Sequence, residues 1–160
     1  MESAAKIKEI LQAASTEKLP EFIAEFETDP RSGVQKLVAS ARKKLDALEK
    51  EKQRIENLKK YEREYAQYSY ICGIDEVGRG PLAGPVVAGA VILPKDCHIL
   101  YINDSKQLSE KKREELYDVI TREAVAWAVG YASPKRIDEI NILQATYEAM
   151  REAIGKLTPA

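Results

Sequence analysis

The stretch YICGIDEVGRGPLAGPVVAGAVILP, residues 70–94, decides the fold of the second half of the chain. A short apolar run leads to two adjacent carboxylates, Asp75 and Glu76, and a second apolar run spans Val86 to Leu93. Glycines and prolines between the two runs exclude a helix there, whereas the runs themselves are rich in β-branched residues. This pattern predicts a strand, a charged turn and a second strand that pairs with the first as an antiparallel hairpin.

Asp75 and Glu76 are candidate metal ligands. Two acidic side chains at the end of a buried strand cost free energy unless a positive partner neutralises them, and a divalent cation that binds phosphate oxygens is such a partner. Adjacent strand residues point to opposite faces, so the two carboxylates can share one ion only if the chain turns between or just after them. Gly78 supplies such a turn. The alternative is a tight hairpin in which Asp75, Glu76 and Arg79 form a surface ion pair.

Two short segments are candidate contacts for nucleic acid. In Gly78–Gly80, the Arg79 guanidinium can bind a phosphate, and the glycines let backbone N–H groups approach a sugar that a Cβ would obstruct. Further along, Asp104 and Ser105 precede Lys106, which places hydrogen-bonding groups beside a cation. The second segment suits a phosphate contact and a loop that merely caps the next helix equally well.

Three segments closely resemble ribonuclease HII, the bacterial type 2 ribonuclease H. They are GIDEVGRGPLAGPVVAGAVIL at 73–93, NDSKQLSEKKREELY at 103–117 and RIDEINILQATYEAM at 136–150. The resemblance covers roughly residues 70–160, and Asp-Glu-x-Gly-Arg-Gly is its most specific element. It implies a metal-dependent endonuclease, using Mn²⁺ or Mg²⁺, that cleaves the RNA strand of RNA–DNA hybrids and single ribonucleotides embedded in a DNA duplex.

The same resemblance assigns roles to individual residues. It implies that Asp75 and Glu76 are two of four catalytic, metal-binding carboxylates, and that Gly78–Gly80 contacts the nucleic acid around the ribose 2′-hydroxyl. It implies that Lys106, with Ser105 beside it, lies near the scissile strand. The family's other two catalytic aspartates lie further downstream than this chain extends. We therefore expect an amino-terminal part of such an enzyme that is inactive or weakly active alone.

Composition narrows the remaining possibilities. The balance of 25 basic and 26 acidic residues excludes a globally cationic nucleic-acid binder. Residues 1–14 show neither a long apolar core nor a small-residue cleavage site, and no apolar run approaches the roughly 18 residues of a membrane span, so we expect a cytoplasmic monomer without membrane contact. Cys72 and Cys97 are too few for a disulfide framework or a zinc cluster, which predicts reduced thiols. His98, the only histidine, is expected to be an ordinary loop residue.

Residues 1–68 differ in composition and are expected to form a separate helical amino-terminal extension, with residues 69–160 as the amino-terminal part of a ribonuclease H-like catalytic domain. Pro20 starts a short helix, and Asp29 is expected to cap a long helix that begins at Pro30. Between Lys36 and Arg63 lie ten Lys/Arg against five Asp/Glu. That excess can attract a phosphate backbone, or it can be a solvated helix face with scattered ion pairs.

The expected fold class is α/β: a ribonuclease H-like mixed sheet, incomplete here with its first three strands, plus the helical appendage. Ala124–Ala132 is expected to be the third strand, with Trp127 in the core, and Ser109 to cap a helix through Ile120. A final helix over 134–155 is expected to contain Asn141 as a buried amide or as support for the site. Its expected buried positions are Ile137, Ile140, Ile142, Leu143, Tyr147, Met150 and Ile154.

Two other functions remain open from the residues. A non-catalytic nucleic-acid-binding module would bind hybrid without metal and with a steep salt dependence. A nucleotide-binding protein built on the Gly-rich turn is disfavoured, because the sequence has no Gly-x-x-x-x-Gly-Lys-Ser/Thr and its glycines do not open a helix.

Overall fold

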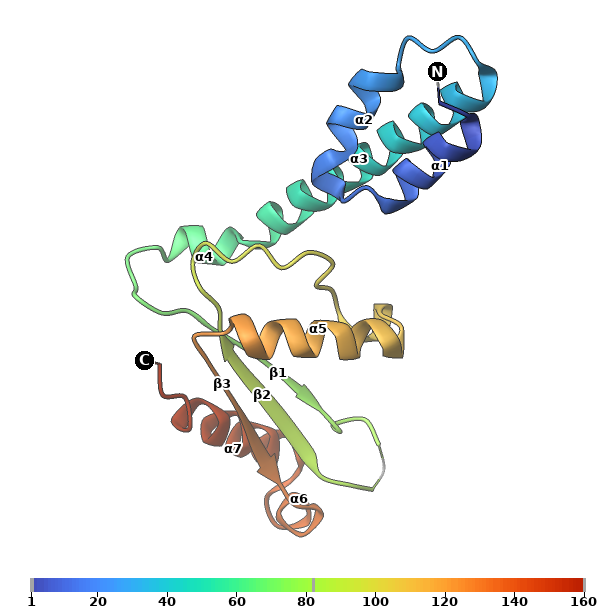
Figure 1. Ribbon diagram of the computed structural model, residues 1–160. Helices are drawn as coiled ribbons and strands as arrows, with labels where there is room; N and C mark the ends of the chain where they lie inside the picture. Colours follow the sequence, from blue (N-terminus) through green and yellow to red (C-terminus); the bar gives the residue numbers. More distant parts are fainter. Residues whose placement is uncertain (1, 82, 160) are drawn as a thin grey trace. The chain divides into compact units, whose positions relative to one another are not determined.

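The computed structural model describes residues 2–81 and 83–159 (Figure 1). The chain separates into two compact units, Met1–Asn57 and Leu58–Ala160. The domain boundary expected between residues 68 and 69 stays a prediction. Among the described residues, no helix is both long and apolar enough to cross a membrane.

The first unit is helical, as predicted. Helix α1 spans Ala4–Ala13, a 3-10 turn spans Thr16–Lys18, α2 spans Leu19–Phe26 and α3 spans Ser32–Leu58. Apolar side chains at helical spacing meet in one core, which removes them from water. The buried members are Ile7, Leu11, Leu19, Phe22, Phe26, Val34, Val38 and Ala41.

Asp29 is not the cap of the long helix, and that prediction was wrong. Helix α3 begins at Ser32, and Asp29 Oδ1 instead accepts hydrogen bonds from the backbone N–H and the Nε of Arg31, each at 2.9 Å. The side-chain and backbone hydrogen bonds from Arg31 lower the pKa of Asp29 from 3.8 to about 2. A charged donor two residues away therefore outcompetes the helix amides for this carboxylate.

The second unit contains an antiparallel sheet of three strands in the order β1-β2-β3. Strand β1 spans Cys72–Val77, β2 spans Val86–Ile92 and β3 spans Ala126–Ala132. The helices are α4 at Lys60–Glu64, a 3-10 turn at Ser105–Gln107, α5 at Glu110–Glu123, α6 at Pro134–Ile140 and α7 at Ile142–Gly155. The predicted hairpin, the third strand and the Ser109 cap are confirmed, and the third strand runs antiparallel to β2.

Helix α7 packs on one face of this sheet through small residues. Ala145, Ala149 and Ala153 are fully buried against the strands. Gly130 lies so close to the helix that an added Cβ would sit 1.9 Å from the carbonyl oxygen of Ala149. Close backbone approach, rather than side-chain bulk, builds this part of the core.

Several expected core positions are therefore exposed. Leu143, Tyr147 and Ile154 are 40%, 43% and 50% exposed, because the alanine face of α7 is the one turned to the sheet. Trp127 is also not in the core. It is 46% exposed on the sheet face opposite α7, where its ring forms a T-shaped pair with Tyr117 at 6.3 Å between the ring centroids.

Asn141 breaks the expected final helix into α6 and α7. Its φ of 70° is a left-handed conformation that ends α6, and its side-chain oxygen accepts the backbone N–H groups of Leu143 and Gln144 to cap α7. The buried-amide prediction was wrong, because Asn141 is exposed.

The outer edge of β3 is covered by side chains of α7 and of the residue that directly follows it. The backbone N–H of Tyr131 donates to Glu152 at 2.9 Å, and Lys156 Nζ donates to the carbonyl oxygen of Val129 at 3.0 Å. The Lys156 ammonium and, second, the Tyr131 N–H lower the pKa of the Glu152 carboxyl. These contacts satisfy backbone groups that an edge strand otherwise leaves open.

Candidate nucleic-acid and metal site

Asp75 and Glu76 lie within β1, because the strand continues to Val77 before the chain turns. Asp75 is opposite Gly89 and Glu76 is opposite Ala88, which is buried beneath α7. Since strand side chains alternate, Glu76 belongs to the α7 face and Asp75 to the other face. The turn follows the pair and does not separate its two members.

Each carboxylate already has a contact. Asp75 Oδ1 accepts the backbone N–H of Glu76 at 2.9 Å, so the Asp75 carboxylate lies beside the backbone of its neighbour. Glu76 Oε1 lies 3.8 Å from Nη1 of Arg79, and the Glu76 side chain is only 24% exposed. The surface ion pair considered from the sequence is thus present between Glu76 and Arg79.

The two glycines around Arg79 serve different purposes. Gly78 has a φ of 90°, and an added Cβ would lie 2.3 Å from the carbonyl oxygen of Pro85, so the turn itself requires glycine. An added Cβ on Gly80 would meet nothing within 4 Å. Space beside Gly80 is therefore open to a ligand.

This loop forms one wall of a pocket of about 260 Å³, and α6 forms the facing wall. The pocket is lined by Gly78, Arg79, Gly80, Pro81, Ala83, Gly84, Pro134, Ile137, Asp138 and Ile142. Sequence reasoning missed Asp138, since it is far from the loop along the chain and the resemblance of segment 136–150 assigned it no role. Only the placement of α6 after β3 reveals it.

Asp75 opens instead into a hollow of about 390 Å³ between α5 and the sheet face that lacks α7. Aromatic and aliphatic groups dominate this hollow. It is lined by Gly73, Ile74, Asp75, Gly89, Ala90, Val91, Tyr117, Ile120, Thr121, Trp127, Ala128 and Val129.

Ser105 and Lys106 line neither of these two pockets. Asp104 Oδ1 accepts the backbone N–H of Lys106 at 2.9 Å and so starts the short 3-10 turn, whereas Ser109 caps the following helix α5. Arg113 holds the same turn by donating to the carbonyl oxygen of Ser105 at 3.3 Å. Ser105 and Lys106 are both exposed, which leaves them accessible to a nucleic-acid strand.

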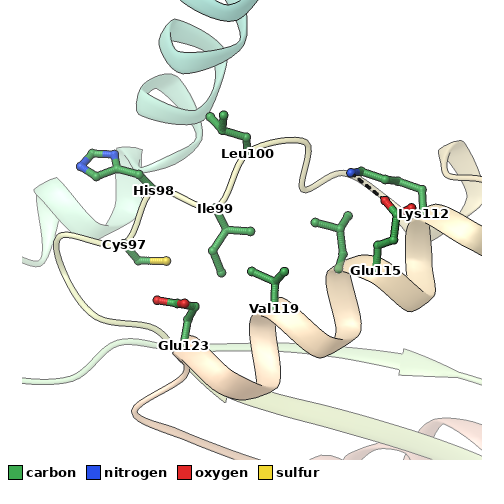
Figure 2. A pocket seen from close by; sticks show the side chains of 9 residues that line it. Cys97, His98, Ile99, Leu100, Lys112, Glu115, Val119 and Glu123 are labelled. Carbon is green, nitrogen blue, oxygen red and sulfur yellow. Dashed lines mark hydrogen bonds and ion pairs between the residues drawn. The ribbon is translucent and has the colours of Figure 1, made fainter. Parts of the chain in front are cut away.

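A further hollow, of about 420 Å³, lies between the loop after β2 and α5 (Figure 2). Ile99 and Val119 point into it, and Lys112 pairs with Glu115 at 3.2 Å on its rim. The hollow contains none of the predicted site residues. It is lined by Cys97, His98, Ile99, Leu100, Lys112, Glu115, Leu116, Val119 and Glu123. Cys97 and Cys72 are free thiols, as predicted.

The residue types present suit a divalent ion, but β1 directs the side chains of Asp75 and Glu76 to opposite faces of the sheet. Asp75 and Glu76 offer the hard oxygen donors that Mg²⁺ and Mn²⁺ prefer, on a strand at the edge of the described sheet. Within residues 2–81 and 83–159, no group of three or more His, Cys, Asp or Glu is assembled to hold a metal. The described residues therefore do not form a closed set of ligands around an ion.

Fold and site together define an α/β protein with a helical amino-terminal part and a carboxylate pair beside a Gly-Arg-Gly turn. The family description "Ribonuclease HII N-terminal domain" matches residues 3–66, and "Ribonuclease HII" matches residues 72–159. The chain belongs to the ribonuclease HII family, which confirms the resemblance seen in the sequence.

Two curated relatives agree with this assignment. Ribonuclease HII of Lachnoclostridium phytofermentans is 64% identical over 132 residues, which are 82% of this chain and 52% of the relative. The Clostridioides difficile protein is 49% identical over 160 residues, 99% of this chain and 63% of the relative. The crystal structure of ribonuclease H2 from Pyrococcus horikoshii aligns with a TM-score of 0.43 and 31% identity, over 55% of this chain and 44% of that one. The chain thus spans 52% and 63% of the length of these two curated relatives.

Proposed function

We propose that this chain supplies the ion-binding and sugar-binding part of an endoribonuclease that cleaves the RNA strand of RNA–DNA hybrids and single ribonucleotides in DNA. One observation carries the proposal: in a ribonuclease HII chain, a carboxylate pair on β1 is followed at once by the Gly78 turn and the open space at Gly80. Carboxylates, an arginine and unobstructed backbone amides thereby adjoin one another.

Asp75 and Glu76 hold the ion, Mg²⁺ or Mn²⁺, through carboxylate oxygens. A bound ion of this kind supplies a Lewis acid for the phosphodiester and lowers the pKa of a coordinated water. Arg79 balances phosphate charge from the adjoining pocket. Ser105 and Lys106 contact the strand from the exposed turn before α5.

Discrimination of RNA from DNA is assigned to Gly78–Gly80. The ribose 2′-hydroxyl both donates and accepts hydrogen bonds, so it can be recognised by backbone groups that approach the sugar closely. The missing side chain at Gly80 leaves room for that approach, and the positive-φ turn at Gly78 directs the loop.

The test uses the complete enzyme and a DNA duplex carrying one ribonucleotide, in Mn²⁺. Asp75→Asn and Glu76→Gln should each reduce the cleavage rate by about 100-fold or more, since each removes an ion ligand at the reacting phosphate. Asp96→Asn, an equal charge change at an exposed loop position, is the matched control and should leave the rate unchanged. Full cleavage by both site variants would reject the proposal, and duplex binding without any cleavage would support a non-catalytic module instead.

A further inference from the structure

Arg79 and Glu76 contact each other, yet the proposed function assigns each of them another partner. We infer that Arg79 couples the divalent ion to the nucleic acid: it is the counter-ion of Glu76 while no metal is bound, and an ion at Glu76 releases it toward a phosphate in the pocket beside α6. This inference rests on the proposed function and adds a linkage between its two ligands.

The local backbone explains why Arg79 serves Glu76. The left-handed turn at Gly78 lets the chain double back after Val77, which brings Nη1 of Arg79 to 3.8 Å from Oε1 of Glu76. Glu76 sits on the α7 face with its side chain only 24% exposed, where an unpaired carboxylate is costly. Asp75, on the more open face, accepts a backbone N–H and is not bonded to this arginine.

The Glu76–Arg79 ion pair is weak enough to separate. Its 3.8 Å distance is longer than a hydrogen bond, and the Arg79 side chain is 49% exposed, so water screens the attraction. An ion on Glu76 neutralises the carboxylate and brings a positive charge next to the guanidinium. Both effects favour departure of Arg79 from Glu76.

Arg79 also lines the pocket of about 260 Å³ between its loop and α6. A phosphate there is the natural next partner, because a guanidinium binds phosphate through two parallel N–H bonds. Asp138 also lines this pocket. By thermodynamic linkage, the ion then strengthens phosphate binding and the phosphate strengthens ion binding by the same factor.

The first experiment measures duplex binding without metal. In EDTA at low salt, fluorescence anisotropy gives the Kd of the enzyme for a DNA duplex carrying one ribonucleotide. Glu76→Gln and Asp75→Asn remove the same charge from neighbouring positions, but only the former releases Arg79. Glu76→Gln should therefore tighten binding about two- to five-fold more than Asp75→Asn, the factor that an exposed ion pair supports.

A double-mutant cycle isolates the arginine. The excess effect of Glu76→Gln should disappear when Arg79→Gln is also present, and it should persist with Arg79→Lys, which keeps the charge. Equal tightening by Glu76→Gln and Asp75→Asn, or an excess that survives Arg79→Gln, would overturn the coupling. Thermal melting of every variant confirms that the proteins compared are folded.

The second experiment measures the ion directly. Electron paramagnetic resonance of free Mn²⁺ should show that Arg79→Gln binds the ion about two- to five-fold more tightly than the unaltered enzyme does. Lys111→Gln removes an exposed cation on α5 and should not change the Mn²⁺ affinity. Unchanged affinity in Arg79→Gln rejects the inference alone, whereas absence of both Mn²⁺ and duplex binding in the unaltered enzyme rejects the proposed function with it.

Discussion

Gly130 of β3 and Ala149 of α7 approach so closely that a Cβ on Gly130 would lie 1.9 Å from the Ala149 carbonyl oxygen. The obstructing atoms belong to backbone, which cannot rotate away as a side chain can. Gly130→Ala should therefore force α7 off the sheet and lower the free energy of unfolding by about 3 kcal/mol or more, the upper range for overpacking.

Chemical denaturation of the chain measures this effect. Gly89→Ala on the neighbouring strand is the control, since an added Cβ there meets nothing within 4 Å. Equal stability of the two variants would show that α7 does not depend on this contact.

Gly80→Ala should reduce cleavage at a single ribonucleotide by about ten-fold or more while Mn²⁺ binding and thermal stability stay unchanged. The protein itself has room for the new methyl group, so a loss of rate reports on a substrate displaced in the pocket. Gly78→Ala is unsuitable for this test because its methyl group would strike Pro85. An unaltered cleavage rate in Gly80→Ala would show that the loop acts only as a turn and does not contact the ribose.

The 160-residue chain alone should bind one Mn²⁺ weakly, with a Kd on the order of 10⁻³ M, and should not cleave a ribonucleotide-containing duplex. One or two carboxylates can hold a hydrated ion loosely. The described residues, however, assemble no group of three or more His, Cys, Asp or Glu that could hold a second ion. Magnetic resonance measures the ion, and gel analysis measures the cut. Turnover that disappears in Asp75→Asn would contradict this expectation.

Helix α3 carries seven Lys/Arg against four Asp/Glu, but several of its cations are already paired. Arg42 contacts Glu27, and Lys52 and Arg54 contact Glu49 and Glu51, as expected for a solvated helix face. If the remaining cations bind phosphate, the double variant Lys43→Gln with Lys44→Gln should lower the salt slope of duplex binding by about one to two. Lys6→Gln with Lys8→Gln on α1 is the matched control. If both double variants keep the salt slope of the unaltered protein, nucleic acid is confined to the second unit.

The Asp29–Arg31 pair predicts an acid-sensitive contribution to stability. Because the folded pKa of Asp29, about 2, lies below the ordinary 3.8, the carboxylate stabilises the fold above pH 3.8 and loses this effect as the pH falls toward 2. Unfolding curves of the chain and of Asp29→Asn should therefore differ at pH 5 and converge near pH 2. A difference that is constant across this range would assign the effect to packing.

Local chemistry in the sequence predicted much of this structure. Proline and glycine positions located the β1–β2 hairpin, and Ser109 located the start of α5, because each acts on its own neighbouring backbone. The helical amino-terminal part followed from apolar spacing. The Asp-Glu and Gly-Arg-Gly elements were likewise visible as adjacent residues.

Features that depend on tertiary contact were not visible. The alanine face of α7 is no more apolar than its Leu143 and Tyr147 side, and only the absent side chain at Gly130 explains which face is buried. Asp138 reaches the Arg79 pocket through the path of α6. Asn141 ended a helix by its backbone conformation, which its residue type permits but does not require.

Glu152 and Lys156 cover the outer edge of β3, so the sheet can be extended at only one of its two described edges. The Tyr131 N–H and the Val129 carbonyl at the β3 edge are already hydrogen-bonded. A further strand would therefore pair with β1, at the other edge of the described sheet. Any segment that joins there arrives next to Asp75 and Glu76 and can bring its own carboxylates to them. The edge at which the sheet can be extended is thereby also the edge that carries the proposed ion ligands.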